Sequence, residues 1–286
     1  MDFPAWDLWN ARWMFTLGLV VVLLSAEWIS PFRHPTQSKL EHVSVNLVIF
    51  GGNSLVLQFL AAWTLFLWSD YVGREGWGLL HHFGLTPVSH VLLSIVLLDL
   101  LAYSIHRFYH RVPFFWRFHR AHHSDLDMDA TTSIRFHLGE VLVTMGIKAL
   151  SVTVLGVSPV GFLISETLTL GVGLFSHANL RLPVRLERAL RLAIVTPAMH
   201  WIHHSRRRAE HNANLGAVFS GWDRLLGTFY MDTAPHEIQF GLEEYPAPED
   251  VTLLRFCRMP FDAPCQARLQ NQPVPASTRA QVNVHR

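Results

Sequence analysis

Long apolar segments separated by short polar connections dominate the first part of the chain. Trp13–Ile29 is almost wholly apolar, is just long enough to span a bilayer, and has tryptophans near both ends. Val43–Trp68 is the longest apolar run; glycine, asparagine and glutamine interrupt it, and it can cross with a tilt. Val88–Ile105 is apolar again. The pattern therefore predicts three membrane-crossing helices before residue 106.

A further apolar segment, Val141–Ser176, is interrupted by the sequence Gly-Val-Ser-Pro at 156–159. Each half has roughly 16 residues, which is short for a full crossing. We therefore predict a helical hairpin that enters the membrane and returns to the same side. Lys148 and Glu166 lie inside it and are expected to face protein or reach the surface. The expected fold is an all-α integral membrane helical bundle with about four to five membrane-embedded helices, the hairpin included.

The distribution of lysine and arginine predicts the orientation. Arg33 and Lys39 follow the first span and four arginines follow the third, whereas the connection between the second and third spans holds only Arg74. The positive-inside rule places the basic segments in the cytoplasm, so residues after the third span face the cytoplasm of a bacterial inner membrane or ER-like membrane. The chain is rich in arginine from Arg181 onward, which predicts a cytoplasmic helical cap lying against anionic head groups.

Composition agrees with a membrane protein, because 50% of the 286 residues are hydrophobic and only 16% are charged. The net charge of +1 gives no indication of nucleic-acid binding. We expect one membrane-embedded domain over residues 1–268, without a cleavable signal peptide, and a polar, disordered tail over 269–286. Cys257 and Cys265 match no zinc or redox motif. A short strand hairpin could form near Gly227–Phe240.

Three histidine clusters are the strongest chemical signal. Two histidines four residues apart end the third span, and the pattern His-x2-His-His then occurs twice. Positions i, i+3 and i+4 share one face of a helix, so each cluster can direct several imidazoles at one point. Neutral imidazole is the commonest protein metal ligand and suits iron, zinc, copper and nickel. Eight rings are too many for one ion and suit two; the predicted ligands are His106, His110, His119, His122, His123, His200, His203 and His204.

Single residues near these clusters are further candidates for the site. His177 lies where the hairpin re-emerges on the side of the clusters, and we predict it as a ninth ligand. Asp99 and Tyr103 precede His106 on its helix. Asp99 could orient a metal-bound imidazole or make a polar contact between helices. Other residues could be ligands, line the site, or cap or pack the fold: His137, His211 and Asn214.

The acidic residues after the second cluster, Asp125, Asp127 and Asp129, could cap a helix or support the site. No Glu follows His106, which excludes the His-Glu-x2-His protease motif, and neither Gly-x-Ser-x-Gly nor a phosphate-binding glycine loop occurs. The remaining histidines are not expected to be ligands: His34, His42, His81, His82, His90, His236 and His285.

Five short motifs together resemble the fatty acid hydroxylase superfamily, also called the sterol desaturase family. They are H-R-F-Y-H, H-R-A-H-H-S, H-W-I-H-H-S, N-A-N-L-G and G-W-D-R-L-L-G-T-F, within residues 88–230. The resemblance implies a membrane enzyme with a di-iron centre held almost wholly by the eight histidines above. Such enzymes insert oxygen from O2 into unactivated C–H bonds or desaturate them. The family often has His-Pro-x-Glu near position 137; here Leu138 replaces the proline and Glu140 is present.

The resemblance implies hydroxylation of an aliphatic C–H bond in a fatty acyl, sterol or related lipid, with O2 as co-substrate. The stretch after Asp250 is too short for a fused electron-transfer domain, so we expect a separate ferredoxin-like, cytochrome-like or pterin donor. A desaturase on the same site, a metal-binding membrane transporter and a bis-histidine haem carrier are the alternatives. The sequence leaves open the lipid, the position oxidised, the donor and the oligomeric state.

Overall fold

The computed structural model describes residues 5–60 and 62–262. Its long helices are α1 (Ala5–Ile29), α2 (Lys39–Leu60), α3 (Ala62–Arg74), α4 (Pro87–Arg111), α6 (Leu138–Leu155) and α7 (Pro159–His177). Four of them, α1, α4, α6 and α7, are long and apolar enough to cross a membrane. The prediction of an all-α, multi-pass membrane bundle is confirmed. The tail predicted over 269–286 lies outside the described residues.

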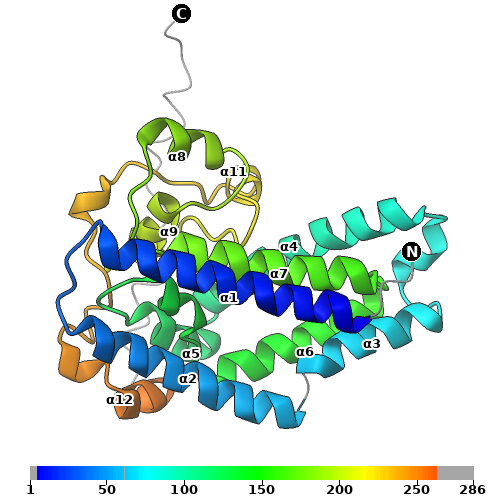
Figure 1. Cartoon of the computed structure of the whole chain (residues 1–286), viewed down its shortest axis with the longest axis horizontal. Helices are drawn as coiled ribbons and strands as arrows, with labels where there is room; N and C mark the ends of the chain where they lie inside the picture. Colours follow the sequence, from blue (N-terminus) through cyan, green and yellow to red (C-terminus); the bar gives the residue numbers. More distant parts are fainter. Residues whose placement is uncertain (1–4, 61, 263–286) are drawn as a thin grey trace, which may run out of the picture.

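Short helices gather at one end of this bundle and form what we call the cap (Figure 1). They are α5 (Pro113–His123), α8 (Val184–Leu190), α9 (Pro197–His203), α10 (Arg208–His211), α11 (Gly221–Leu225) and α12 (Leu253–Arg258), with 3-10 turns η2 (Ala130–Ile134), η3 (Pro235–Glu237), η4 (Pro248–Asp250) and η5 (Met259–Phe261). A further turn, η1 (Leu79–Phe83), precedes α4. Among the described residues, β-pairing is limited to isolated bridges. The strand hairpin suggested near Gly227–Phe240 does not form, because Phe240 pairs with Ser205 instead.

α6 and α7 form the helical hairpin predicted over Val141–Ser176. The expectation that each half is short for a full crossing is wrong, because both helices are long and apolar enough to cross a membrane. Gly156 ends α6 at φ +67°, where an added Cβ would collide with the Trp77 carbonyl. The starts of α4 and α7 are joined, because the Ser158 N–H donates to Ser94 Oγ at 2.9 Å. These helices therefore run in parallel and bring their last residues to the cap. Lys148 and Glu166 pair across the hairpin at 2.6 Å, as expected for charges that avoid lipid.

The apolar run Val43–Trp68, predicted as one span, contains α2 and α3. Residue 61, between the two helices, lies outside the described residues, so the single span stays a prediction. The polar positions His42, Asn46 and Asn53 share one face of α2 and bond to the segment 125–136; Asn53 Nδ2, for example, donates to the Phe136 carbonyl at 2.7 Å. One face of α2 thus packs against protein and not against lipid.

Candidate metal centre

Nine buried or half-buried histidines converge in two groups where the bundle meets the cap. Within each group, one ring nitrogen per residue lies within 4.8 Å of all the others. The first group is His106, His110, His119, His123 and His203, and the second group is His122, His177, His200 and His204. The groups adjoin, since the rings of His123 and His204 stack with centroids 4.3 Å apart. All eight motif histidines and His177 therefore converge as predicted.

Each His-x2-His-His motif contributes to both groups. On α5, His119 and His123 enter the first group and His122 the second; on α9 and its C-cap, His200 and His204 enter the second group and His203 the first. Residues i and i+4 lie nearly above one another on a helix, whereas residue i+3 points to one side. A proline at the first turn starts both helices and fixes their direction. One short motif can thus serve two centres.

Backbone carbonyls fix the tautomer of three rings. His106 Nδ1 lies 2.9 Å from the Leu215 carbonyl oxygen, and His203 Nδ1 lies 2.9 Å from that of Ala213. His177 Nδ1 lies 2.7 Å from the Gly173 carbonyl oxygen. A carbonyl only accepts, so each Nδ1 must carry the proton. In the neutral ring, Nε2 then carries a lone pair that can bind a metal ion.

Many ring nitrogens in the two groups are buried without a hydrogen-bond partner. They are both nitrogens of His110, His123 and His204, Nε2 of His119 and His203, and Nδ1 of His122 and His200. The Nε2 atom of His177 lies 3.0 Å from that of His200 and 3.2 Å from that of His122. So many orphaned polar atoms would cost the fold considerable free energy unless something binds them. A metal site satisfies this requirement, and the donor set fits one.

Electrostatics favour the neutral, ligating form of imidazole. Burial, and then the neighbouring imidazoles, lowers the pKa of the cap histidines well below the usual value: His122, His123, His200, His203 and His204. These rings are therefore uncharged at neutral pH and can offer lone pairs to a cation.

Glu140 supports the site and was not singled out as a site residue from the sequence. Its Oε1 accepts a hydrogen bond from His119 Nδ1 at 2.7 Å, which leaves His119 Nε2 directed at the first group. Carboxylates commonly orient metal-bound histidines in this way. The signal in the sequence is the segment His-Leu-Gly-Glu at 137–140, whose glutamate contacts the site while its histidine caps α6.

Of the roles open to His137, the structure supports that of a helix cap. It belongs to neither histidine group. It caps the start of α6, where its Nδ1 accepts from the Gly139 N–H at 3.1 Å. A histidine used as a helix cap has its ring held against the backbone and away from the centre.

Asp99 and Tyr103 make no hydrogen bond to a histidine among the described residues, and of the two roles open to Asp99 the structure supports the polar contact between helices. Asp99 accepts hydrogen bonds of 2.8–3.0 Å from Val218 N, Phe219 N and Trp222 Nε1. The Tyr103 hydroxyl lies 2.8 Å from Thr228 Oγ1. Both residues instead fasten the segment 215–228 to α4. The Leu215 carbonyl that holds His106 belongs to this segment, so their influence on the centre is indirect.

Asn214 and His211 border the centre without joining it. Asn214 adopts φ +54°, and its Nδ2 donates to the carbonyls of Met199 and Tyr230 at 3.0 and 2.7 Å. It therefore fastens α9 to the loop that follows. The His211 ring stacks on Trp116 at 5.2 Å and lies 5.9 Å from the ring of His123. It lines the first group from outside.

An apolar helical bundle with two buried histidine groups at one end is the architecture of a membrane metalloprotein. Residues 91–228 match the family model "Fatty acid hydroxylase", and this domain includes all nine histidines. Residues 91–228 therefore carry a fatty acid hydroxylase domain, which confirms the resemblance to the fatty acid hydroxylase, or sterol desaturase, superfamily.

Three relatives illustrate the similarity. Ornithine lipid hydroxylase OlsE of Rhizobium tropici is 32% identical over 152 residues, which cover 53% of this chain and 45% of the relative. Cholesterol 25-hydroxylase of Rattus norvegicus is 28% identical over 151 residues, 52% of this chain and 49% of the relative. Human alkylglycerol monooxygenase is 26% identical over 140 residues, which cover 49% of this chain and 30% of the relative. The match thus spans about half or less of each relative's length. No solved structure matches the chain.

Proposed function

We propose that this protein is a membrane-bound di-iron monooxygenase that hydroxylates an aliphatic C–H bond of a lipid, using O2 and electrons from a separate donor. The observation that carries the proposal is the pair of adjoining groups of buried, unpartnered imidazoles at one end of an apolar bundle. The three relatives are named as hydroxylases or monooxygenases, which favours hydroxylation over desaturation and over metal transport.

The first group would hold one iron ion and the second group the other. Bound iron would supply the activation of O2 and the removal of hydrogen from an unactivated C–H bond. The chain's own contribution is to keep its donor atoms in place. The carbonyls of Leu215, Ala213 and Gly173 and the carboxylate of Glu140 hold four Nδ1 atoms, so that four Nε2 atoms can face the centre.

Aromatic side chains close the centre against water. The Phe136 ring stacks on His122 at 4.6 Å, and the Tyr109 ring stacks on His119 at 5.5 Å. An apolar enclosure keeps the imidazoles neutral and limits loss of reactive oxygen to water. Because α4 and α7 end at the centre, a lipid tail could approach from the bilayer. We place this end of the bundle on the cytoplasmic side, on the basis of its arginines.

The test compares lipid extracts of cells that express the wild-type protein, His122→Ala or the surface control His236→Ala, with heavy-isotope O2 supplied. His122 is buried in the second group, whereas the His236 side chain is 77% exposed. We expect the wild type and the control to yield a lipid that carries one labelled oxygen atom, and His122→Ala to yield none while still inserting. Product with two hydrogens fewer and no label would indicate desaturation; equal labelled product from all three proteins would refute the ligand assignment.

A further inference from the structure

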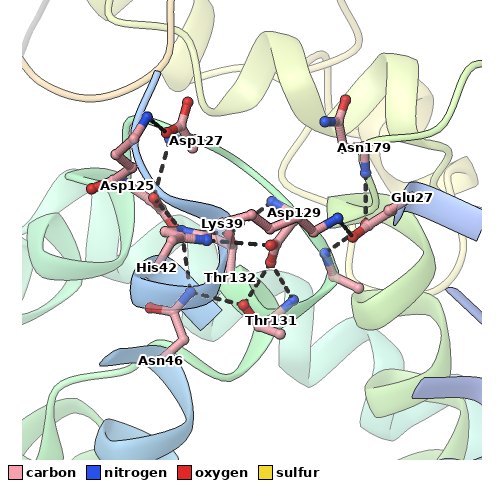
Figure 2. A network of polar contacts seen from close by, with 12 residues as sticks. Glu27, Lys39, His42, Asn46, Asp125, Asp127, Asp129, Thr131, Thr132 and Asn179 are labelled. Atoms are coloured by element: carbon pink, nitrogen blue, oxygen red, sulfur yellow. Dashed lines mark hydrogen bonds and ion pairs between the residues drawn. The ribbon is translucent and has the colours of Figure 1, made fainter. Parts of the chain in front are cut away.

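A cavity of about 960 Å³ lies outside the two histidine groups, between the end of α1, the start of α2 and the cap. Its lining includes charged residues of the polar network in Figure 2, among them Glu27, Lys39 and His42. Its wall includes the aromatic rings of Phe32 and Phe240. A cavity with both charged and aromatic lining suits an amphiphilic ligand.

The two cations of the network, Lys39 and His42, are already paired with carboxylates of the same network. Lys39 Nζ lies 3.3 Å from Glu27 Oε2, and the His42 ring lies 2.8 Å from Asp125 and 3.2 Å from Asp129 (Figure 2). Asp127 accepts hydrogen bonds from Thr36 and Gln37. This side of the cavity therefore has little unbalanced positive charge to offer a ligand.

Two arginines of the cavity wall, Arg33 and Arg206, differ from these paired cations, because neither of them pairs with a carboxylate among the described residues. Arg33 donates through its two Nη atoms to the carbonyls of Ile238 and Pro235. The Arg206 guanidinium makes no hydrogen bond or ion pair to the described part of the chain, and only its backbone N–H is bound, to the Gln239 carbonyl at 2.7 Å. The Nε atoms of both arginines are buried without a partner. Arg33 bonds to the segment 235–239 through its side chain and Arg206 through its backbone N–H, and both residues line the cavity.

The cavity lies at the depth of the lipid head groups. The span candidate of α1 ends at Ile29, and Trp28, which lines the cavity, is 67% exposed. Lys39 Nζ lies 5.7 Å from the Trp28 ring. Tryptophan and lysine together are typical of the membrane interface. The wall also adjoins the centre, since Phe32 stacks at 5.0 Å on Trp201, which lies between His200 and His203 in the chain.

We propose that this cavity binds the anionic head group, a phosphate or a carboxylate, of a bilayer lipid between Arg33 and Arg206. A guanidinium matches the geometry of both anions and binds them through paired hydrogen bonds. The lipid tail would leave past Trp28 into the bilayer. The proposal does not depend on the oxidation reaction, because it concerns residues that belong to neither histidine group.

The test measures retention of phosphatidylglycerol by the full-length protein in detergent, by native mass spectrometry. Diacylglycerol serves as the probe without an anion, and inorganic phosphate as the free-anion competitor. Arg206→Gln removes a guanidinium that holds no other part of the fold, Arg206→Lys keeps the charge, and Arg185→Gln removes an exposed arginine of α8 as the matched control.

We expect the wild type and Arg185→Gln to retain one phosphatidylglycerol molecule in preference to diacylglycerol. Arg206→Gln should bind it about 10-fold more weakly, because hydrogen bonds between charged groups are lost, with Arg206→Lys in between. Unchanged metal content will show that the variants are folded. Equal binding by Arg206→Gln and Arg185→Gln, equal retention of diacylglycerol, or displacement by inorganic phosphate at the same concentration would overturn the proposal.

Discussion

Buried histidine serves two opposite purposes in this molecule. In the network of Figure 2, His42 lies between Asp125 and Asp129. Burial alone would lower the pKa of His42, but these two carboxylates raise it to about 10, so the ring is a cation. In the two histidine groups, His119 alone among the described rings has a carboxylate as a hydrogen-bond partner, and the pKa of the cap rings His122, His123, His200, His203 and His204 is lowered.

The comparison shows that carboxylate contacts, more than burial, separate a structural histidine from a potential ligand. His119 is the informative case, because it has a carboxylate partner and yet lies in the first group. Glu140 occupies only its Nδ1 and leaves Nε2 unpartnered, whereas both ring nitrogens of His42 are bound by carboxylates. One carboxylate orients a ligand, and two convert the ring into an ion-pair partner.

The largest expected effect distinguishes the two kinds of histidine directly. His123→Ala removes a ring at the junction of the two groups, and we expect at least roughly 100-fold loss of lipid oxidation, more than removal of a supporting partner alone would cause. Bound metal and product should both fall while the amount of protein in the membrane stays the same. If product formation by His123→Ala stayed within a few-fold of wild type, the first group would not be a metal site.

The next effect concerns stability. His42→Gln leaves Asp125 and Asp129 buried without their cation, which we expect to destabilise the fold by about 3 kcal/mol while metal binding per folded molecule is retained. The charged and polar groups that face His42 are Asp125, Asp129 and Asn46, with Arg135 beyond Asn46. Thermal unfolding in detergent measures the change. Loss of metal without loss of stability would reverse the roles assigned here.

The same residue predicts a pH dependence. The pKa of His42 is higher in the folded protein than its usual value, so its stabilising effect is complete below about pH 6.5 and is lost as the pH rises through about 10. The melting temperature of the wild type should therefore fall between neutral and alkaline pH by more than that of His42→Gln. If the melting temperatures of the two proteins fell equally with rising pH, His42 would not be charged in the folded protein.

A smaller effect tests the carboxylate that supports the centre. Glu140→Gln weakens the hydrogen bond that orients His119, and we expect metal affinity to fall 10- to 100-fold, with partial recovery in Glu140→Asp. Metal content after graded chelator treatment measures this, and His137→Gln is the neighbouring control. Equal metal retention by all three variants would show that Glu140 does not support the metal site.

The sequence predicted those parts of the site that depend on local spacing. The eight motif histidines follow from helical periodicity, and His177 follows from the direction of the hairpin. Contacts between distant segments could not be predicted, such as His119 with Glu140 or His42 with Asp125. Periodicity also cannot identify the partner of a buried side chain. Asp99 and Tyr103 share a helix with His106, yet they bond to the segment 215–228.

For the same reason, the sequence alone does not show how α2 packs. The apolar run Val43–Trp68 has the composition of one span, and its few polar residues are weak interruptions by themselves. Their partners lie in the segment 125–136, far away in the sequence, so the protein-facing side of α2 is visible only in three dimensions.

The central claim is that the two histidine groups each bind an iron ion through nitrogen ligands. Iron content per chain, measured together with X-ray absorption on the full-length protein purified without chelators, tests it most directly. The account predicts about two iron ions per chain with a ligand shell dominated by imidazole nitrogen. A protein that remains active with one metal ion or none, or whose iron is bound mainly by oxygen or sulfur, would contradict it.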